Sequence, residues 1–107
     1  MSDTHRIIIT DDALSELEGI ARYIRQHSPQ NAANVAAKIL DSIDSLALMP
    51  NRFRQVGKSK KRGTEIRAML VRPYIVYYRI EDDSLVVFVL TIRHASQRQP
   101  RRLPQDN

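Results

Sequence analysis

The order of hydrophobic patterns along these 107 residues predicts an α+β fold with an N-terminal edge strand, an antiparallel two-helix hairpin and a small, mostly antiparallel sheet. A short β-branched run comes first, two segments with apolar residues at helical spacing follow, and three strand-like segments come last. A helical hairpin packed on one face of such a sheet buries the apolar surfaces of both. We therefore expect a β-α-α-β-β-β order in one domain over residues 1–98, with a basic, flexible tail over 99–107.

The first half of the chain carries the strand and both helices. Residues 6–10 are short and β-branched, which predicts an edge strand. Thr10 and the two aspartates after it offer an N-cap and acidic charge for an amphipathic helix of about four turns. Ser28 offers a second N-cap, and the proline after it suits the first helical position. The second helix should end near Met49, because a proline follows that residue.

The second half predicts a basic loop over 50–63 and then three strands, over 64–71, 74–80 and 85–92. The last strand is apolar at nearly every position, so it should be central and covered on both faces. The first of the three alternates. Ile66, Ala68 and Leu70 fall on one side, and Glu65, Arg67 and Met69 fall on the other.

Charge is unevenly divided along the chain. Residues 1–50 hold four Lys and Arg against seven Asp and Glu, whereas residues 51–107 hold thirteen against five. The net charge of +5 is therefore −3 in the first half and +8 in the second, which predicts a polyanionic partner, either nucleic acid or an acidic protein segment. The chain has no cysteine, its first residues lack the long apolar core typical of a signal peptide, and its longest later apolar run is too short to span a bilayer. We expect a cytoplasmic protein with no membrane partner.

Three stretches resemble the RelE/ParE toxins of type II toxin–antitoxin systems: LALMPNRFRQVG at the end of the hairpin, EIRAMLVRPYIVYYRI in the strands, and LVVFVLTIRHASQR at the end. The resemblance covers about residues 6–98. Its most specific pieces are Tyr77-Tyr78-Arg79, His94 and Arg98. It implies a growth-inhibiting toxin without a cofactor, held in a tight complex with a cognate antitoxin, and operator DNA bound only through that antitoxin. Three widely spaced histidines predict no metal site.

Two activities occur among these toxins, and the resemblance leaves both open. ParE-like members inhibit DNA gyrase without established catalytic residues, and RelE-like members cut mRNA on the ribosome. Metal-free RNA cleavage needs an acid, a base and cations around one phosphate. For a ribonuclease, the candidates are Arg67, Arg79 and His94. No tyrosine follows Tyr78, which departs from the RelE-like pattern and favours a ParE-like toxin.

A lysine-rich loop favours the ribonuclease, which stays as the alternative. A non-catalytic nucleic-acid-binding module is a third hypothesis, although Asp41 and Asp44 give the second helix an acidic exposed face that would repel phosphates.

These hypotheses predict three groups of functional residues. The alternation suggests that Arg67, Tyr77 and Arg79 share the sheet face that the helices leave uncovered. The antitoxin-binding set is Arg67, Met69, Ile75, Tyr77 and Arg79. The basic loop contributes Lys58, Lys60 and Lys61. The target-binding set follows the last strand and comprises Arg93, His94, Arg98, Arg101 and Arg102.

Overall fold

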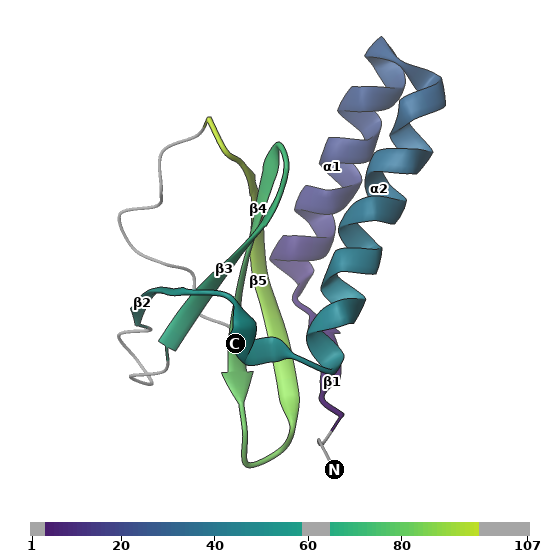
Figure 1. Ribbon diagram of the computed structural model, residues 1–107. Coiled ribbons are helices and arrows are strands. Elements are labelled where there is room, and N and C mark those ends of the chain that lie inside the picture. Colours follow the sequence, from purple (N-terminus) through teal and green to yellow (C-terminus); the bar gives the residue numbers. More distant parts are fainter. Residues whose placement is uncertain (1–3, 59–64, 97–107) are drawn as a thin grey trace.

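A helical hairpin packs on one side of a five-stranded sheet in the computed structural model, which describes residues 4–58 and 65–96 (Figure 1). This arrangement confirms the predicted α+β fold. The hairpin consists of α1 (Asp11–His27) and α2 (Pro29–Asp44). The sheet has the order β1-β5-β4-β3-β2. Its strands are β1 (Arg6–Ile9), β2 (Gln55–Lys58), β3 (Glu65–Val71), β4 (Tyr74–Glu81) and β5 (Val86–His94).

Local signals position both helices, with two corrections. The Thr10 hydroxyl accepts a hydrogen bond from the Ala13 N–H, so the predicted N-cap of α1 is confirmed. Ser28 precedes the second helix but makes no such side-chain bond to its backbone, and its hydroxyl accepts from the Asn31 side chain. The second helix ends at Asp44 rather than near Met49. The chain there tightens into two 3-10 turns, Ser45–Ala47 and Pro50–Arg52.

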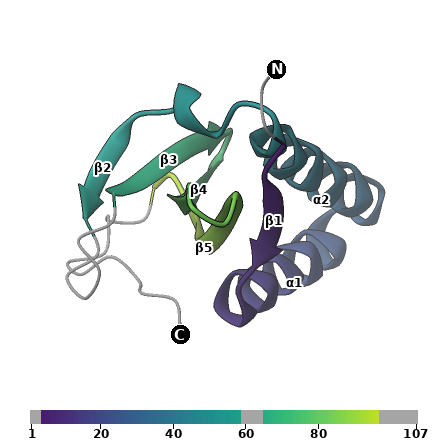
Figure 2. The ribbon, with the colours of Figure 1, turned by 90° about the horizontal axis from the view of Figure 1, so that it is seen from below.

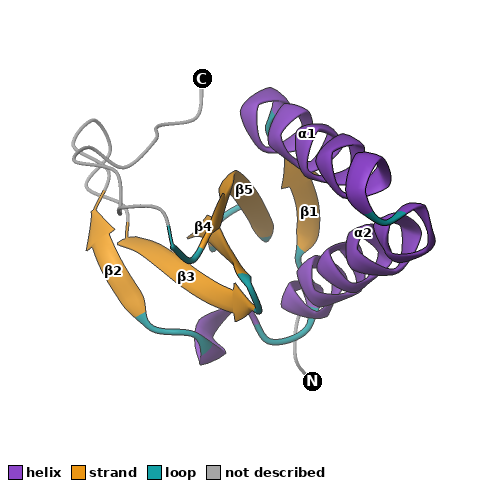
Figure 3. Cartoon of the chain, turned by 90° about the horizontal axis from the view of Figure 1, so that it is seen from above, coloured by secondary structure: helices purple, strands orange, loops and turns teal. Residues whose placement is uncertain are grey.

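Strand β1 is the predicted edge strand, and it pairs in parallel with β5. The other neighbouring strands pair antiparallel. Strand β5 lies between β1 and β4, which agrees with its continuous apolar sequence. Figure 2 and Figure 3, which view the molecule from opposite ends, show β1 against the hairpin and β2 on the far side of the sheet.

Strand β2 was not expected, because the sequence predicted a loop over residues 50–63. It has only four residues, Gln55–Lys58, and it pairs with β3 through a register shift between Gln55 and Gly57. Alternation cannot identify so short a strand, because it contains a glycine and has polar side chains at both ends. Polar ends and a bulge are common at exposed sheet edges, where they discourage pairing with other chains.

Two hydrophobic clusters lie on opposite faces of the sheet. The larger cluster joins the hairpin to one face and includes Ile43, Met69 and Tyr78. The smaller one lies on the other face around Ile66, Tyr77 and Leu90. Within residues 4–58 and 65–96, no helix is long and apolar enough to cross a membrane.

Candidate functional site

Arg67 and Arg79 lie on opposite faces of the sheet, so the expectation that they share one face is wrong. In the antiparallel register, Arg67 is opposite Tyr78 and Arg79 is opposite Ile66. Directly opposed residues project to the same face. Arg67 therefore lies on the hairpin side with Tyr78, and Arg79 lies on the other side with Ile66. Alternation separates the residues of β3 into two sets, but it does not say which set meets the helices.

On the hairpin side, Arg67 and Tyr78 hold the segment that follows α2. The Arg67 guanidinium donates to the Phe53 carbonyl at 2.6 Å, and it also pairs with Glu65 at 3.2 Å. The buried Tyr78 hydroxyl donates to the Pro50 carbonyl at 2.6 Å. Burial raises the pKa of Tyr78 to about 12, although the nearby Arg67 charge opposes the shift. Both side chains act here as structural donors.

Arg79 is enclosed on the other face, where only 2% of it is exposed. Its guanidinium pairs with Glu81 at 3.1 Å and lies 4.1 Å from the centre of the Phe88 ring. Ser84 donates a hydrogen bond to the same Glu81 carboxylate. Stacking on an aromatic ring and pairing with a carboxylate are the two interactions that let a guanidinium lie inside a fold.

The remaining members of the predicted antitoxin set do not form one open surface. Met69 was predicted to contact the antitoxin, but it is 2% exposed and packs in the larger cluster under the helices, so it offers no surface to a partner. Tyr77 is buried and Ile75 is half-buried on the opposite face. Of these three side chains, Ile75 alone offers appreciable surface to a partner.

His94 lies at the exposed end of β5, beside Tyr74 at the start of β4. The two rings meet edge to face with centres 5.5 Å apart. The Ser96 N–H and hydroxyl both bond to Nδ1 of His94, at 3.0 and 2.7 Å. Because a backbone N–H can only donate, Nδ1 is the acceptor, and the neutral ring carries its proton on Nε2.

Arg93 is joined to α1 through Glu16, a residue that the sequence analysis did not single out. The Glu16 carboxylate accepts from the Thr91 hydroxyl at 2.6 Å and from the Ile92 N–H at 3.1 Å. Arg93 Nε lies 3.8 Å from the same carboxylate. Strand β1 ends before this part of β5, so Glu16 satisfies an N–H on an edge that no strand pairs. No local sequence pattern predicts a contact between residues that are 75 positions apart.

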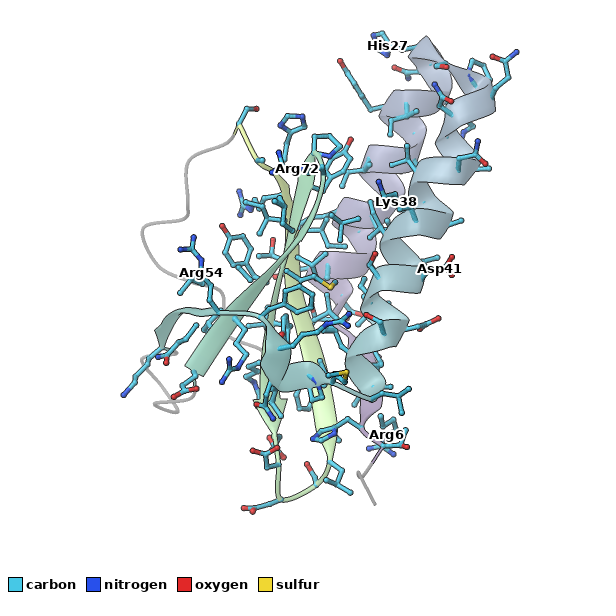
Figure 4. The ribbon with its side chains drawn as sticks, in the orientation of Figure 1. Arg6, His27, Lys38, Asp41, Arg54 and Arg72 are labelled. Atoms are coloured by element: carbon cyan, nitrogen blue, oxygen red, sulfur yellow. The ribbon has the colours of Figure 1, made fainter. Side chains whose placement is uncertain are left out.

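The side chains of Asp41 and Arg54 point away from opposite sides of the molecule. Figure 4 shows Asp41 projecting from the outer surface of α2, and Arg54 projecting from the far side of the sheet. Lys58 is exposed at the end of β2. The other predicted cations, Lys60, Lys61, Arg98, Arg101 and Arg102, lie outside the described residues. No cluster of three His, Asp or Glu side chains able to hold a metal occurs in the described ranges.

Two proteins of similar sequence and one solved structure of similar fold carry the names of toxins or of toxin–antitoxin systems. The chain is 39% identical over 98 residues to a Sinorhizobium fredii protein named "Putative toxin Y4kP", covering 92% of this chain and 96% of that one. It is 33% identical over 92 residues to "Toxin RelE2" of Caulobacter vibrioides, covering 86% and 97%. Its fold is similar to the solved "Chromosomal ParDE TA system from P. aeruginosa", with a TM-score of 0.66, 18% identity, and coverage of 85% of this chain and 96% of that one.

A family model matches most of the chain, whereas the names of the similar proteins are divided between ParE and RelE. The model described as "ParE toxin of type II toxin-antitoxin system, parDE" matches residues 7–99. That range spans the hairpin, all of the sheet but its first residue, and the Arg93–Ser96 end. The chain belongs to the ParE toxin family of type II toxin–antitoxin systems, within the RelE/ParE superfamily.

Proposed function

We propose that this toxin acts in the cytoplasm by binding and inhibiting DNA gyrase, and that a cognate antitoxin silences it. We choose gyrase over mRNA because the residues that RNA cleavage would need lie far apart. Arg67 and Arg79 lie on opposite faces. His94 is opposite Tyr74, five residues along β4 from Arg79, or about 16 Å at 3.3 Å per residue. Acid and cations must surround one phosphate, so this geometry supports action by contact.

The contact surface proposed for the target is the end of β5. Arg93 is partly exposed and His94 is exposed. Arg98, Arg101 and Arg102 follow in the sequence. Cations that the fold does not enclose can meet an acidic surface on another protein at little desolvation cost.

A cognate antitoxin follows from the family and from the similarity to a solved ParDE system. The predicted contacts of Arg67, Ile75, Tyr77 and Arg79 with it stay predictions, and operator DNA would be bound through it alone. Arg67 and Ile75 keep enough exposed surface to take part directly.

The test is a supercoiling assay with purified gyrase, run beside growth measurements in cells. The full chain should arrest growth and inhibit supercoiling. The cognate antitoxin should restore both growth and supercoiling. A chain truncated after His94 should be harmless. Growth arrest with normal supercoiling and ribosome-dependent cuts in mRNA would contradict the proposal.

One observation favours the second candidate, a RelE-like ribonuclease. The hydrogen bonds at Nδ1 leave the His94 proton on Nε2, where it could be donated to a leaving oxygen. The 33% identity to a protein named Toxin RelE2 is compatible with it. Mapping of mRNA ends after induction tests this candidate independently of gyrase.

A further inference from the structure

One cross-strand row at the open end of the sheet joins two apolar side chains to Arg93. This end is where β3 turns into β4 and where β5 finishes (Figure 1). Leu70 of β3 is opposite Ile75 of β4, and Ile75 is opposite Arg93 of β5. Directly opposed residues project to the same face, with their Cβ atoms about 4.5–5.5 Å apart. Ile75 packs against the smaller cluster, so the row lies on the face away from the helical hairpin.

Leu70 is the most exposed apolar side chain of this row. It is 49% exposed, although it is the sixth of the seven residues of β3. Of the large apolar side chains that are exposed in the described ranges, it alone belongs to a strand. It is a member of neither hydrophobic cluster, and the half-buried Ile75 beside it extends its apolar surface. The packing of the fold therefore does not account for a leucine at this position.

The charge at this end of the sheet is mainly positive. Arg93 has 38% of its side chain exposed, and its Nε lies 3.8 Å from the carboxylate of Glu16 on α1. Arg72 is exposed in the β3–β4 turn, and Figure 4 shows it at this end of the molecule. The acidic residues of β3, β4 and β5 are Glu65 and Glu81, and both lie at the opposite end of their strands. The apolar pair is thus flanked by two arginines.

This row supplies what the target surface proposed above lacks. That surface consists of cations, and cations at the edge of an interface contribute more to orientation and association rate than to affinity. Affinity comes mainly from a few large side chains at a centre from which water is excluded. A single exposed leucine is common on a protein surface, but one in line with a second apolar residue and a cation has the layout of a binding surface.

The same layout identifies the chemistry of the partner. Two apolar side chains between arginines suit a protein segment that carries an apolar side chain with carboxylates beside it. A nucleic acid, which binds mainly through its phosphates, would gain nothing from an exposed leucine.

We propose that Leu70 and Ile75 form the apolar centre of the surface that this toxin presents to its target, with Arg72 and Arg93 around it. The segment of the target that binds there carries an apolar side chain flanked by Asp or Glu. The inference rests on the proposed function, in which the target is gyrase and the end of β5 contacts it. It extends that contact from β5 across β4 to the end of β3.

The test compares substitutions of Leu70 in the full chain, with purified gyrase and in cells. Leu70→Ala should weaken inhibition of supercoiling by ~10-fold and Leu70→Glu by ~100-fold, as expected for a central contact. Leu70→Met keeps the volume and the apolar character, so it should inhibit within about threefold of the wild type. Growth arrest in cells should follow the same order.

Leu48→Glu is the matched control. It makes the same substitution at a side chain that is 61% exposed and lines a hollow with Asp82, near the β4–β5 turn at the other end of the sheet. It should inhibit gyrase like the wild type.

The sign of the added charge tests the chemistry of the partner. Leu70→Lys and Leu70→Glu both remove the apolar side chain, but they add opposite charges. Carboxylates on the target attract the lysine and repel the glutamate, so Leu70→Lys should inhibit at least ~5-fold better than Leu70→Glu. Inhibition of equal strength by the two variants would contradict an acidic partner.

Binding of each variant to the purified antitoxin separates the two partners, because Ile75 was also predicted to contact the antitoxin. Unchanged affinity would show that the variant is folded and that the lost contact belongs to the target. If Leu70→Glu lost antitoxin affinity and kept its toxicity, the row would belong to the antitoxin and the proposal would be wrong. Leu70→Ala, which truncates a half-exposed side chain, decides the question if Leu70→Glu does not fold.

Three other results would overturn the proposal. One is a folded Leu70→Glu that inhibits gyrase and arrests growth like the wild type. Another is a wild-type dimer in solution that Leu70→Glu separates, which would give the row to a second copy of the chain. A third is a short RNA bound by the wild type and released by Leu70→Glu. Failure of the gyrase target gives a different result, because the wild type itself would then leave supercoiling unchanged, and growth arrest by the Leu70 variants would still decide whether the row contacts the target.

Discussion

The two ends of the β4–β5 hairpin use an arginine in opposite ways. At the turn end, Arg79 is 2% exposed, paired with Glu81 and stacked on Phe88. At the open end, the Arg93 side chain is 38% exposed, and only its Nε lies near Glu16 and Thr91. The same residue type is therefore enclosed by the fold at one end and presented at the other.

This difference separates structural cations from those available for binding. An enclosed guanidinium would have to break an ion pair and a ring contact before it could meet a ligand. A partly held guanidinium is already oriented and still has free donors, so little ordering cost remains when a partner arrives. Function is therefore expected at the Arg93 end, and loss of stability is expected from changes at the Arg79 end.

Replacing each of the two arginines should test this difference with the largest effect on stability. Arg79→Ala should lower the free energy of unfolding by about 3 kcal/mol, because it removes a buried side chain together with its carboxylate and ring partners. Arg93→Ala should cost less than about 1 kcal/mol, since the side chain is partly solvated. Urea unfolding of both variants measures the difference.

Toxicity of the same two variants sharpens the result. Arg93→Ala should be folded and weakly toxic, whereas Arg79→Ala should lose toxicity only in proportion to its unfolded fraction. If Arg79→Ala were fully stable but inhibited growth less than the wild type, Arg79 would act in the toxic activity itself, and its structural role would be refuted.

The fold was predictable because its signals are local. Apolar spacing identified both helices, Thr10 marked the first helix start, and β-branched runs or alternation identified four strands. Strand β2 was missed because its four residues become a strand only through pairing with β3. The register that places Arg67 and Arg79 on opposite faces is likewise a property of paired strands, and it is absent from either strand alone.

The candidate site was less predictable for the same reason. His94 and Arg93 could be singled out by their position after an apolar strand. Glu16 could not, because its importance comes from α1 packing beside the end of β5. A glutamate on a helix surface has no distinguishing pattern in the sequence.

Tyr78 lies between the two ends of β4 and should give an intermediate effect. Tyr78→Phe removes the hydroxyl that donates to the Pro50 carbonyl, so it should lower the free energy of unfolding by about 1–2 kcal/mol. Its pKa of about 12 in the fold lies above the ordinary 10, so the unfolded chain loses this proton first as pH rises. Wild-type stability should therefore fall between pH 10 and about 12.

Tyr78→Phe should lack that part of the alkaline loss, while remaining less stable than the wild type at pH 7. Thermal melts of both proteins across this pH range give the measurement. Parallel curves for the two proteins would show that the Tyr78 proton contributes nothing to folding.

His94→Ala should have the smallest effect, and it tests what the open end of the hairpin does. The side chain is exposed, and its loss removes an edge-to-face contact with Tyr74 and bonds to Ser96, worth about 0.5–1 kcal/mol together. If toxicity depends on contact with gyrase over the whole end of β5, no proton transfer is lost, and growth arrest should stay within about twofold of wild type. If His94 were the acid of a ribonuclease, the rate of mRNA cleavage should instead fall by ~10²–10⁴-fold. Growth curves, gyrase supercoiling and mRNA end mapping on the same variant separate the two cases, because a lost contact and a lost proton donor differ by at least an order of magnitude.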